Sequence, residues 1–478
     1  MRSLAMLIVV AVAGCTVGPN YVRPDIAVPD QWRIDYPKTA EVANTRWWEQ
    51  FGDPELNDLI QTALRDNHDV RVAAARVDQF IGQLVATRSQ LFPQIGYGAG
   101  ASRFRSSREG LPALPPGVDN YFTLYEASLG ASWQLDLFGR VRRLSEAARA
   151  QVYASEQAKR GVVLSLVAGV ASSYILLRGL DSQLEIAQAT ARNFAETKRI
   201  FDARFKAGIV SRTEVSQITS QYQQALAAIP GIRQQIAAQE NMICVLLGRN
   251  PGPIARGRTI HDLLTPLIPA DLPSTLLERR PDILQAEQNL IAANANVGAA
   301  QALYFPSLSL TGALGTASTA FGAFLTGPAS AWLIGASLAG PIFTAGGIEG
   351  QVGAAEAQQR QAVEFYKQTI INAFRETNDA LTGSQETGEQ VAEQVKRVQA
   401  LREYARLSHL RFEKGVSSYL EVLIADNELF AAELVSVQML ANRYTQLVNV
   451  YQAMGGGWVD LADSVRAEPQ GAAALRVP

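Results

Sequence analysis

The sequence predicts a mixed fold, in which long α-helices are combined with membrane-spanning β-strands that several copies of the chain share. Three observations predict it. A motif that starts at Arg204-Phe205 is repeated from Arg411-Phe412, two very long runs contain no proline, and two other regions have the residue pattern of strands. A duplicated unit of strands and helices is typical of an assembled object and not of a catalytic pocket.

The N-terminus has the pattern of a bacterial lipoprotein signal. Met1-Arg2 precedes an apolar stretch from Leu4 to Ala13 that is too short to span a bilayer. Small residues stand directly before Cys15, and this boundary resembles a lipobox, while Thr16 resembles the residues that sort lipoproteins to the outer membrane. We predict that residues 1–14 are a cleaved signal peptide and that Cys15 is the lipid attachment site. The alternative is an ordinary cleavage site beside an incidental cysteine.

The composition excludes several function classes. The 478 residues include 43 Lys and Arg and 45 Asp and Glu, a net charge of −2, without a basic run, so no nucleic acid partner is expected. None of His68, His261 and His409, the only histidines, has a second histidine or cysteine at ligand spacing. Phosphate-binding, dinucleotide-binding and nucleophile-elbow motifs are absent. We therefore expect no enzyme, no catalytic residue, no metal, and no cofactor beyond the covalent lipid on Cys15.

The first ordered element follows a proline-rich stretch. Residues 15–46 are predicted to be a lipid-anchored extended tether, and the ordered body begins near Trp47. Apolar residues then recur at helical spacing, with Asp53 as the N-cap and Pro54 at the first helical position. The helical run, with or without a break, reaches about Leu91.

The next segments have the period of strands. From Tyr125 to Leu137 the odd positions are apolar, and the even positions are small, polar or acidic. Strict alternation over this length is typical of a strand that faces lipid on one side and a lumen on the other, because such a strand needs about 9–11 residues. Its predicted partner is the segment 95–102, and a long polar loop containing Arg103, Arg105, Arg108 and Glu109 joins the two.

The second copy contains two more strand-like segments. Residues 288–348, a stretch of 61, contain no Asp, Glu, Lys or Arg. They are too rich in Gly, Ser, Thr and Pro for a transmembrane helix, whereas segments 308–311 and 332–338 have the pattern of short strands. The alternative is a buried hairpin of a soluble protein.

Four strands cannot close into a barrel. An open edge in hydrocarbon leaves unsatisfied backbone groups at several kcal/mol each, so the barrel must be shared between chains. Two chains supply eight strands, whose side chains fill the lumen, and three supply twelve, which leave an aqueous path. We therefore predict a homotrimer with one shared 12-stranded barrel.

The proline-free runs predict long helices. They extend from 139 to 207 and from 347 to 414, which is coiled-coil length, although Gly383 and Gly388 are points where the second could be interrupted. Each run ends at a glycine of the repeated motif, Gly208 or Gly415. Because Ser211 and Ser418 are each followed three residues later by a glutamate, both are predicted to start a return helix through a capping box. The repeated motif is therefore interpreted as the tip of a helical hairpin.

These elements divide the chain into two repeats, 47–250 and 276–456, joined by a linker at 251–275 and followed by a disordered tail at 457–478. At the start of the second repeat, the segment 279–283 (Arg-Arg-Pro-Asp-Ile) is interpreted as structural and not as a binding site. Pro281 suits the first turn of a helix, and Asp282 suits its positive end.

Several short motifs in a fixed order resemble one known family, the outer membrane factors or TolC-like proteins, and specifically the OprM/NodT-type lipoproteins. The motifs are the lipobox, the Trp-x-x-Phe-x-Asp-Pro-x-Leu opening at 48–56, Phe92-Pro93, Leu137-Phe138-Gly139-Arg140, Leu277-x-Arg279-Arg280-Pro281-Asp282-Ile283, Phe305-Pro306, Pro341-Ile342-Phe343 and the two tip motifs. The resemblance spans nearly the whole chain.

The resemblance implies a trimeric channel-tunnel, with a barrel in the outer membrane of a Gram-negative bacterium continued by a periplasmic α-helical barrel. It implies a periplasmic adaptor and an inner-membrane pump of the resistance-nodulation-division class as partners. The chain would be the passive exit duct of this tripartite efflux system for drugs or other toxic small molecules, gated at the periplasmic tips. The substrate and the particular adaptor and pump are not readable from the sequence.

For the gate, the resemblance points to the return helix after the second tip. Leu420 matches the apolar constriction, but Ile424 stands where some relatives carry an aspartate. Asp426, two residues further, would lie on another face of the helix. The gate candidates are therefore Leu420, with charge contributed by Asp426 or Glu421. The alternative is that Leu420 packs between helices and Glu421 only caps one.

The tips are candidate adaptor contacts by position alone. The motif residues Gly208, Ser211, Gly415 and Ser418 are joined by neighbours in both loops, namely Lys206, Ala207, Ile209, Val210, Glu413, Lys414, Val416 and Ser417. Two alternatives to an efflux duct stay open: an outer-membrane duct for protein secretion, and a lipid-anchored coiled-coil structural protein without a pore. The coiled-coil alternative leaves the alternating strands and the uncharged stretch unexplained.

Overall fold

The computed structural model describes residues 16–26, 28–29, 32, 46–109, 117, 119–268 and 275–456. The predicted signal peptide, Cys15 and the tail 457–478 lie outside these residues. The chain forms two compact units, and each contains parts of both repeats. The first comprises Met1–Asp25, Val77–Ala154 and Ala286–Tyr366, and the second comprises Ile26–Arg76, Ser155–Gln285 and Lys367–Pro478.

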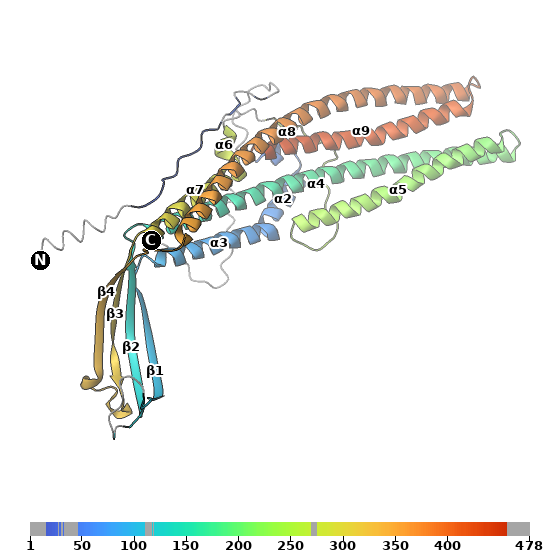
Figure 1. Cartoon of the computed structure of the whole chain (residues 1–478). Helices are drawn as coiled ribbons and strands as arrows, with labels where there is room; N and C mark the ends of the chain where they lie inside the picture. The colour runs from blue at the N-terminus through green and yellow to red at the C-terminus, as the bar shows by residue number, and fades with distance from the viewer. Residues whose placement is uncertain are drawn as a thin grey trace. The chain divides into compact units, whose positions relative to one another are not determined.

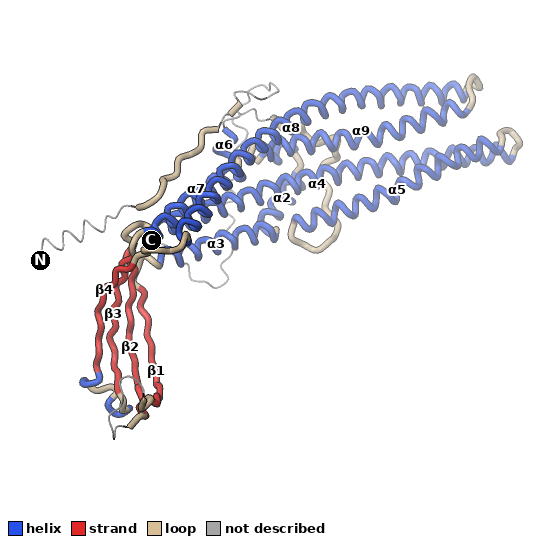
Figure 2. Tube along the Cα trace, in the orientation of Figure 1, coloured by secondary structure: helices blue, strands red, loops and turns tan. Residues whose placement is uncertain are grey.

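The first unit contains a four-stranded antiparallel sheet with the strand order β1-β2-β3-β4 (Figure 2). The strands are β1 (Gln94–Arg105), β2 (Tyr121–Leu135), β3 (Ser307–Ser318) and β4 (Ser330–Ala339). The first repeat supplies one hairpin and the second repeat supplies the other. All four strands predicted from the sequence are present. The predicted loop position of Arg103 and Arg105 is wrong, because both pair with β2 and belong to β1. β2 begins before Tyr125, at Tyr121, and ends at Leu135, two residues before the predicted end at Leu137.

The pairing register gives the sheet one apolar face. Residues paired directly across strands lie on the same face, and alternate residues along a strand lie on opposite faces. The face shared by Tyr97, Leu129, Leu314 and Trp332 is apolar, and these four side chains are 58–90% exposed. The neighbouring level of the opposite face carries Gly98, Ser128, Gly315 and Ala331. A large exposed apolar face on a sheet is typical of a surface that contacts lipid.

The junction between strand and helix explains two of the short motifs, Leu137-Phe138-Gly139-Arg140 and Phe305-Pro306. The Asp136 carboxylate accepts from the backbone N–H groups of Val141 and Arg142 and so caps α4 (Arg140–Lys206). Phe138 and Phe305 stack with ring centroids 4.6 Å apart. Gly139 has φ of 77°, a left-handed conformation that favours glycine.

The described start of the chain is bound to this junction. Val17 N–H donates to the carbonyl of Phe138, and the buried Arg143 guanidinium donates to the carbonyls of Val17 and Gly18. A Cβ at Gly139 would lie 2.5 Å from a side-chain carbon of Thr16, so only glycine allows this approach. Thr16 is therefore held where the sheet of the first unit joins its helices.

The second unit contains two long helical hairpins. One is α4 with α5 (Arg212–Leu246), and the other is α8 (Gly347–Glu413) with α9 (Tyr419–Ala453) (Figure 1). Of the two possibilities left open for the second long run, the uninterrupted helix is observed: α8 is continuous through Gly383 and Gly388. Gly383 serves packing instead, since a Cβ there would lie 2.9 Å from Gln446 Oε1 of α9.

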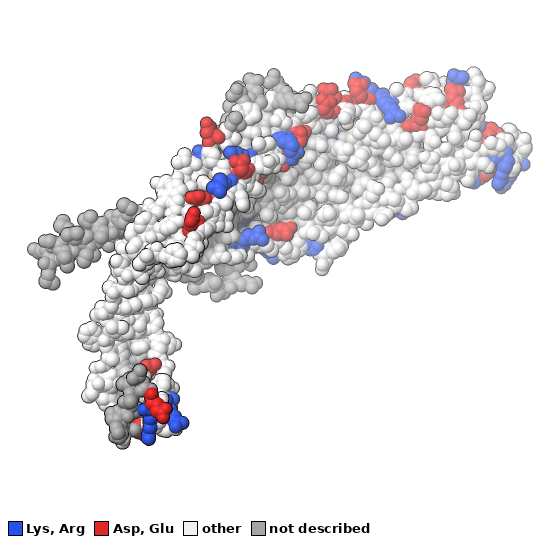
Figure 3. All heavy atoms as spheres, viewed as in Figure 1, with Lys and Arg blue, Asp and Glu red and all other residues white. Residues whose placement is uncertain are grey.

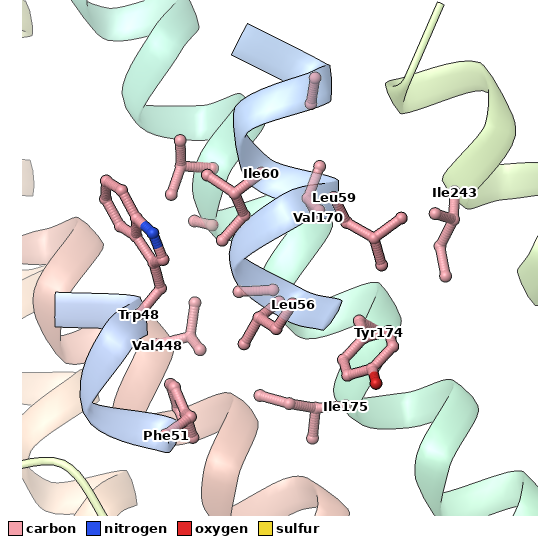
Figure 4. Close-up of a cluster of buried hydrophobic side chains, with 14 of the residues drawn as sticks. Trp48, Phe51, Leu56, Leu59, Ile60, Val170, Tyr174, Ile175, Ile243 and Val448 are labelled. Atoms are coloured by element: carbon pink, nitrogen blue, oxygen red, sulfur yellow. The ribbon is translucent and has the colours of Figure 1, made fainter. Parts of the chain in front are cut away.

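A hydrophobic core joins the hairpins to the short helices near the N-terminus. Trp47, Trp48 and Phe51 come from a 3-10 helix at Trp47–Phe51, and α2 (Pro54–Asp66) adds Leu56 and Ile60, all five at most 2% exposed (Figure 4). The first helical run, for which the sequence left a break open, is broken at Asn67, between α2 and α3 (His68–Ser89).

By length and composition α4 is the one helix, among the residues described, that could cross a membrane. Its apolar residues Val163, Val167, Val170 and Ala171 are fully buried in the core of the second unit. Packing inside the protein therefore accounts for its hydrophobicity.

Asp53 stands at the start of α2 and is fully buried. The predicted cap is confirmed: the side chain accepts from Glu55 N–H, and Pro54 occupies the first helical position. The carboxylate also accepts from the Tyr174 hydroxyl at 2.9 Å and from Arg258 N–H at 2.9 Å. Burial, above all, raises the pKa of Tyr174. One aspartate thus connects α2, α4 and the loop after α5.

Candidate functional site at the helix tips

The two hairpin tips have the same backbone geometry. Gly208 and Gly415 have φ of 76° and 72°, which only glycine adopts readily. At the first tip, the backbone N–H groups of Gly208 and Ile209 donate to the backbone carbonyls of Phe205 and Arg204, respectively. At the second tip, the N–H groups of Gly415 and Val416 donate in the same way to the carbonyls of Phe412 and Arg411. Both tips therefore end a long helix through the same left-handed cap, as the duplicated motif predicts.

The return helices start differently. At Ser211 the predicted capping box is confirmed: the hydroxyl accepts from Glu214 N–H, and the Glu214 carboxylate accepts from Ser211 N–H. At Ser418 the predicted capping box is wrong, because the side chain makes no capping hydrogen bond. Glu421 Oε1 lies 3.7 Å from Arg411 Nη1 instead, so an ion pair across the tip replaces the reciprocal cap.

An aromatic cluster joins the two tips. Phe201 of α4 contacts Tyr419 of α9, with ring centroids 4.3 Å apart, and also Phe412 at 6.2 Å. Phe412 and Tyr419 are 5.2 Å apart. The Phe201 and Tyr419 side chains are buried, and burial, above all, raises the pKa of Tyr419. The relative position of the tips is therefore held by apolar packing next to the candidate gate.

The gate candidates lie on different sides of α9. Leu420 is 49% exposed, and Ile424, one turn later, is 43% exposed, so the two form an apolar stripe on the open side of the helix. Within one chain Leu420 does not pack between helices. Glu421 and Asp426 are half-buried, and they face Arg411 and His409 respectively. Neither of the two candidate carboxylates, Glu421 and Asp426, therefore lies on the Leu420 stripe.

The pair of His409 and Asp426 is a feature that the sequence analysis missed. Nε2 of His409, on α8, lies 3.0 Å from both carboxylate oxygens of Asp426, on α9. The hydrogen bond with Asp426 raises the pKa of His409 above its usual value of 6.5, and the charges of Asp426 and Glu413 act in the same direction, against partial burial. A histidine and an aspartate that are 17 residues apart, on two helices joined by a loop, give no periodic signal, so only the packing of α8 on α9 shows the pair.

This pair predicts that the second tip is more stable in mild acid. Because the folded pKa of His409 is raised, its contribution to stability is complete below the unfolded pKa and is lost as the pH rises through the folded pKa. The His409 side chain is half exposed, so the effect stays below about 1 kcal/mol. Hydrogen exchange of the segment around 405–430, corrected for intrinsic rates, should be slower at about pH 6 than at about pH 8.

The matched control is His409→Gln, which keeps a polar side chain but cannot gain the charge. In that variant the corrected exchange of the second tip should no longer depend on pH. Equal pH dependence in the variant and the parent chain would assign the effect to another group.

The candidate adaptor contacts are accessible in the single chain. Lys206, Ala207, Ile209, Glu413, Lys414 and Val416 are exposed, and Val210 and Ser417 are half-buried. Ile209 and Val416 stand at the same motif position of the two tips and are 71% and 68% exposed. Each tip therefore presents one apolar side chain beside charged neighbours.

The Arg-Arg-Pro-Asp-Ile segment has the structural role that the sequence analysis gave it. Pro281 is the first residue of α7 (Pro281–Gln301). The buried Arg280 guanidinium donates to the Ala453 carbonyl and forms ion pairs with Asp282 and Glu376, both at 2.7 Å. The segment thereby fastens the start of α7 to α8 and to the end of α9.

Among the described residues, no group of three or more His, Cys, Asp or Glu side chains could hold a metal ion. Cys15 lies outside the described residues, and Cys244 is buried, with a free thiol.

Known proteins share both the sequence and the fold. A family model described as outer membrane efflux protein matches residues 59–249 and 272–456. The chain is 35% identical over 471 residues to the probable efflux pump outer membrane protein TtgC of Pseudomonas putida, covering 96% of each chain. It is 32% identical over 463 residues to the cation efflux system protein CusC of Escherichia coli, covering 96% of this chain and 99% of the relative.

Solved structures match over more than nine-tenths of the chain. A crystal structure of CusC superposes with a TM-score of 0.83 at 31% identity, covering 92% of this chain and 100% of that one. The open-state structure of the MtrE outer membrane channel of Neisseria gonorrhoeae superposes with a TM-score of 0.85 at 30% identity, covering 93% and 99%.

Two long helical hairpins and a four-stranded sheet with one apolar face, in the fold of these solved channels, define an outer-membrane channel-tunnel of the TolC-like class. The predicted fold class is confirmed. The chain belongs to the outer membrane efflux protein family, and it is an efflux channel component located in the outer membrane.

Proposed function

We propose that the chain forms a homotrimeric, lipid-anchored exit duct, which works with a periplasmic adaptor and an inner-membrane pump of the resistance-nodulation-division class. The duct carries drugs or other toxic small molecules passively, and the pump supplies the energy. It performs no catalysis of its own. The tips of α4–α5 and α8–α9 are its periplasmic gate and its contact with the adaptor.

The observation that carries the proposal is the open sheet. β1 and β4 are its two edges, and in the described chain neither has a strand on its outer side. Unpaired backbone groups in hydrocarbon cost several kcal/mol each, so the edges need partners from other copies. Three copies give twelve strands, and the face of Gly98, Ser128, Gly315 and Ala331 then lines an aqueous lumen.

The relatives support small molecules as the exported class. Their names describe a probable efflux pump for TtgC, toluene or antibiotic efflux pumps for other Pseudomonas putida proteins, and cation efflux for CusC. Because the proposed lumen is wide and lined by small side chains, selection among such substrates falls to the pump.

A resistance assay tests the proposal. A strain that lacks its own outer-membrane efflux component, but keeps a compatible adaptor and pump, should regain resistance to antibiotics or toluene when this chain is expressed. Conductance in planar bilayers without any gain of resistance would favour the protein-secretion duct. Absence of both, with the protein in the membrane, would favour the coiled-coil structural protein.

Lipidation is a separate part of the proposal. Thr16 is held at the junction of sheet and helix, where the barrel leaves the membrane, so acyl chains on the preceding residue would reach the inner leaflet directly. Two acyl chains give stable attachment because each buried CH₂ contributes about 0.8 kcal/mol.

We predict that membrane-extracted protein has the mass of a trimer of chains that start at acylated Cys15. Cys15→Ser should abolish the acyl mass, whereas Cys244→Ser, which changes the other cysteine, should keep it. Native mass spectrometry in detergent reads assembly and modification together. An unlipidated parent chain would disprove the anchor without affecting the channel.

A further inference from the structure

The outer end of the sheet carries a pair of arginines that the channel function does not use. Along the sheet no charged residue occurs from Gln94 to Ser102 or anywhere in β3 and β4, and Arg103 is the first charge on β1. In the space-filling view the sheet is uncharged along most of its length, and blue and red atoms gather at its far end (Figure 3).

Both arginines lie on the apolar face. They alternate with Phe104 along β1, so they share the side of Ile95, Tyr97, Ala99 and Ala101. In the register Arg105 pairs with Tyr121, and Arg103 pairs with Thr123. Glu126, the one acidic residue within the strands, lies on the opposite face because it occupies an even position of β2.

Tyr121 holds the two guanidinium groups near each other. Cζ of Arg103 lies 5.9 Å from the centre of the Tyr121 ring, and Cζ of Arg105 lies 5.5 Å from it. Both arginines are exposed, and Tyr121 is 46% exposed. In the part of the chain that the structure describes, neither guanidinium forms an ion pair. Two cations and a phenol hydroxyl therefore point outward with no acidic partner.

The position of Arg103 and Arg105 along β1 corresponds to the outer boundary of the membrane. A tilted transmembrane strand crosses the hydrocarbon in about 9–11 residues. Counted from Ile95, Arg103 is the ninth residue and Arg105 is the eleventh. The opposite end of β1, at Gln94, follows α3, which belongs to the periplasmic side. Tyrosine at such a boundary is typical of the aromatic girdle of a barrel. The arginines therefore lie at the depth of the headgroups of the outer leaflet.

Here we propose that Arg103, Arg105 and Tyr121 form a binding site for the phosphate groups of lipid A, the lipid component of lipopolysaccharide in the outer leaflet. A guanidinium presents a planar fork of donors that matches a phosphate group, and the low-dielectric boundary strengthens the attraction. The Tyr121 hydroxyl supplies a further donor. The site rests on the proposed shared barrel, because only a closed barrel directs this face to lipid.

The probe is purified trimer incubated with bisphosphorylated lipid A and measured by native mass spectrometry. The parent trimer should retain lipid A. The affinity of the Arg103→Gln/Arg105→Gln variant should be lower by about tenfold or more, because hydrogen bonds to charged groups are stronger than hydrogen bonds between neutral groups. Arg108→Gln, which changes an exposed arginine of the loop without a contact to Tyr121, is the matched control and should bind as the parent does. Arg103→Lys/Arg105→Lys should retain part of the affinity.

The source of the phosphate is tested in the same experiment. Dephosphorylated lipid A should not be retained, and inorganic phosphate alone should not remain bound in its place. Equal retention by the double variant, or of dephosphorylated lipid A, would overturn the proposal, and retention of inorganic phosphate in place of lipid A would make the site one for a free anion. The mass of the trimer is read in every spectrum, so failed assembly is distinguished from failed lipid binding.

Discussion

Asp53→Ala is expected to destabilise the helical unit by about 3–5 kcal/mol, the largest effect that we predict for a single substitution. The carboxylate is fully buried and accepts three hydrogen bonds, from Glu55 N–H, Tyr174 Oη and Arg258 N–H. Loss of a helix cap costs about 1 kcal/mol, and each buried donor left without a partner costs about 1–3 kcal/mol. Alanine removes the cap and leaves the buried Tyr174 hydroxyl and the part-buried Arg258 N–H without this acceptor.

Thermal loss of the helical circular dichroism signal of the detergent-solubilised protein is the measurement. Asp58→Ala is the matched control, because it removes an exposed aspartate from the same helix and should change stability by no more than about 0.5 kcal/mol. Asp53→Asn should fall between the two, since an amide keeps one acceptor oxygen. If Asp53→Ala and the Asp58→Ala control lost the helical signal at the same midpoint temperature, the hydrogen bonds of Asp53 would not be stabilising the unit.

The second large effect concerns the proposed gate. Leu420→Ser/Ile424→Ser is expected to raise single-channel conductance several-fold and to make cells more sensitive to large antibiotics that enter through an open channel. The two side chains form the exposed apolar stripe of α9 beside the second tip. In the trimer, three such stripes meeting at the axis would exclude water, because a narrow apolar constriction dewets. Serine would allow the constriction to fill.

The control is Val435→Ser, which changes another exposed apolar residue of α9, away from the tip, and should leave conductance unchanged. Planar bilayer recordings at one salt concentration compare the variants. An unchanged conductance in the double variant would place the constriction elsewhere, and an equal rise in Val435→Ser would indicate general loosening of the helices.

Most elements of the fold follow from local sequence. The alternation from Tyr125 predicts β2, the proline-free runs predict α4 and α8, and Gly208 and Gly415 mark both tips. These signals are local, because a strand or a helix imposes its period on neighbouring residues, and a left-handed turn requires glycine. The two capping boxes show the limit. The same residue spacing forms a capping box at Ser211 and none at Ser418, where Glu421 forms an ion pair with Arg411 instead.

The residue pattern is therefore enough to predict the long hairpins, the four strands, the duplicated tips and the outer-membrane class. The folded chain is needed to show which side chains meet: Asp426 with His409, Asp53 with Tyr174 and Arg258, and two arginines with Tyr121. The physical reason is that backbone periodicity is set within a few residues. Contacts between elements depend instead on the register and packing of segments that are far apart in the chain, and no local pattern records these.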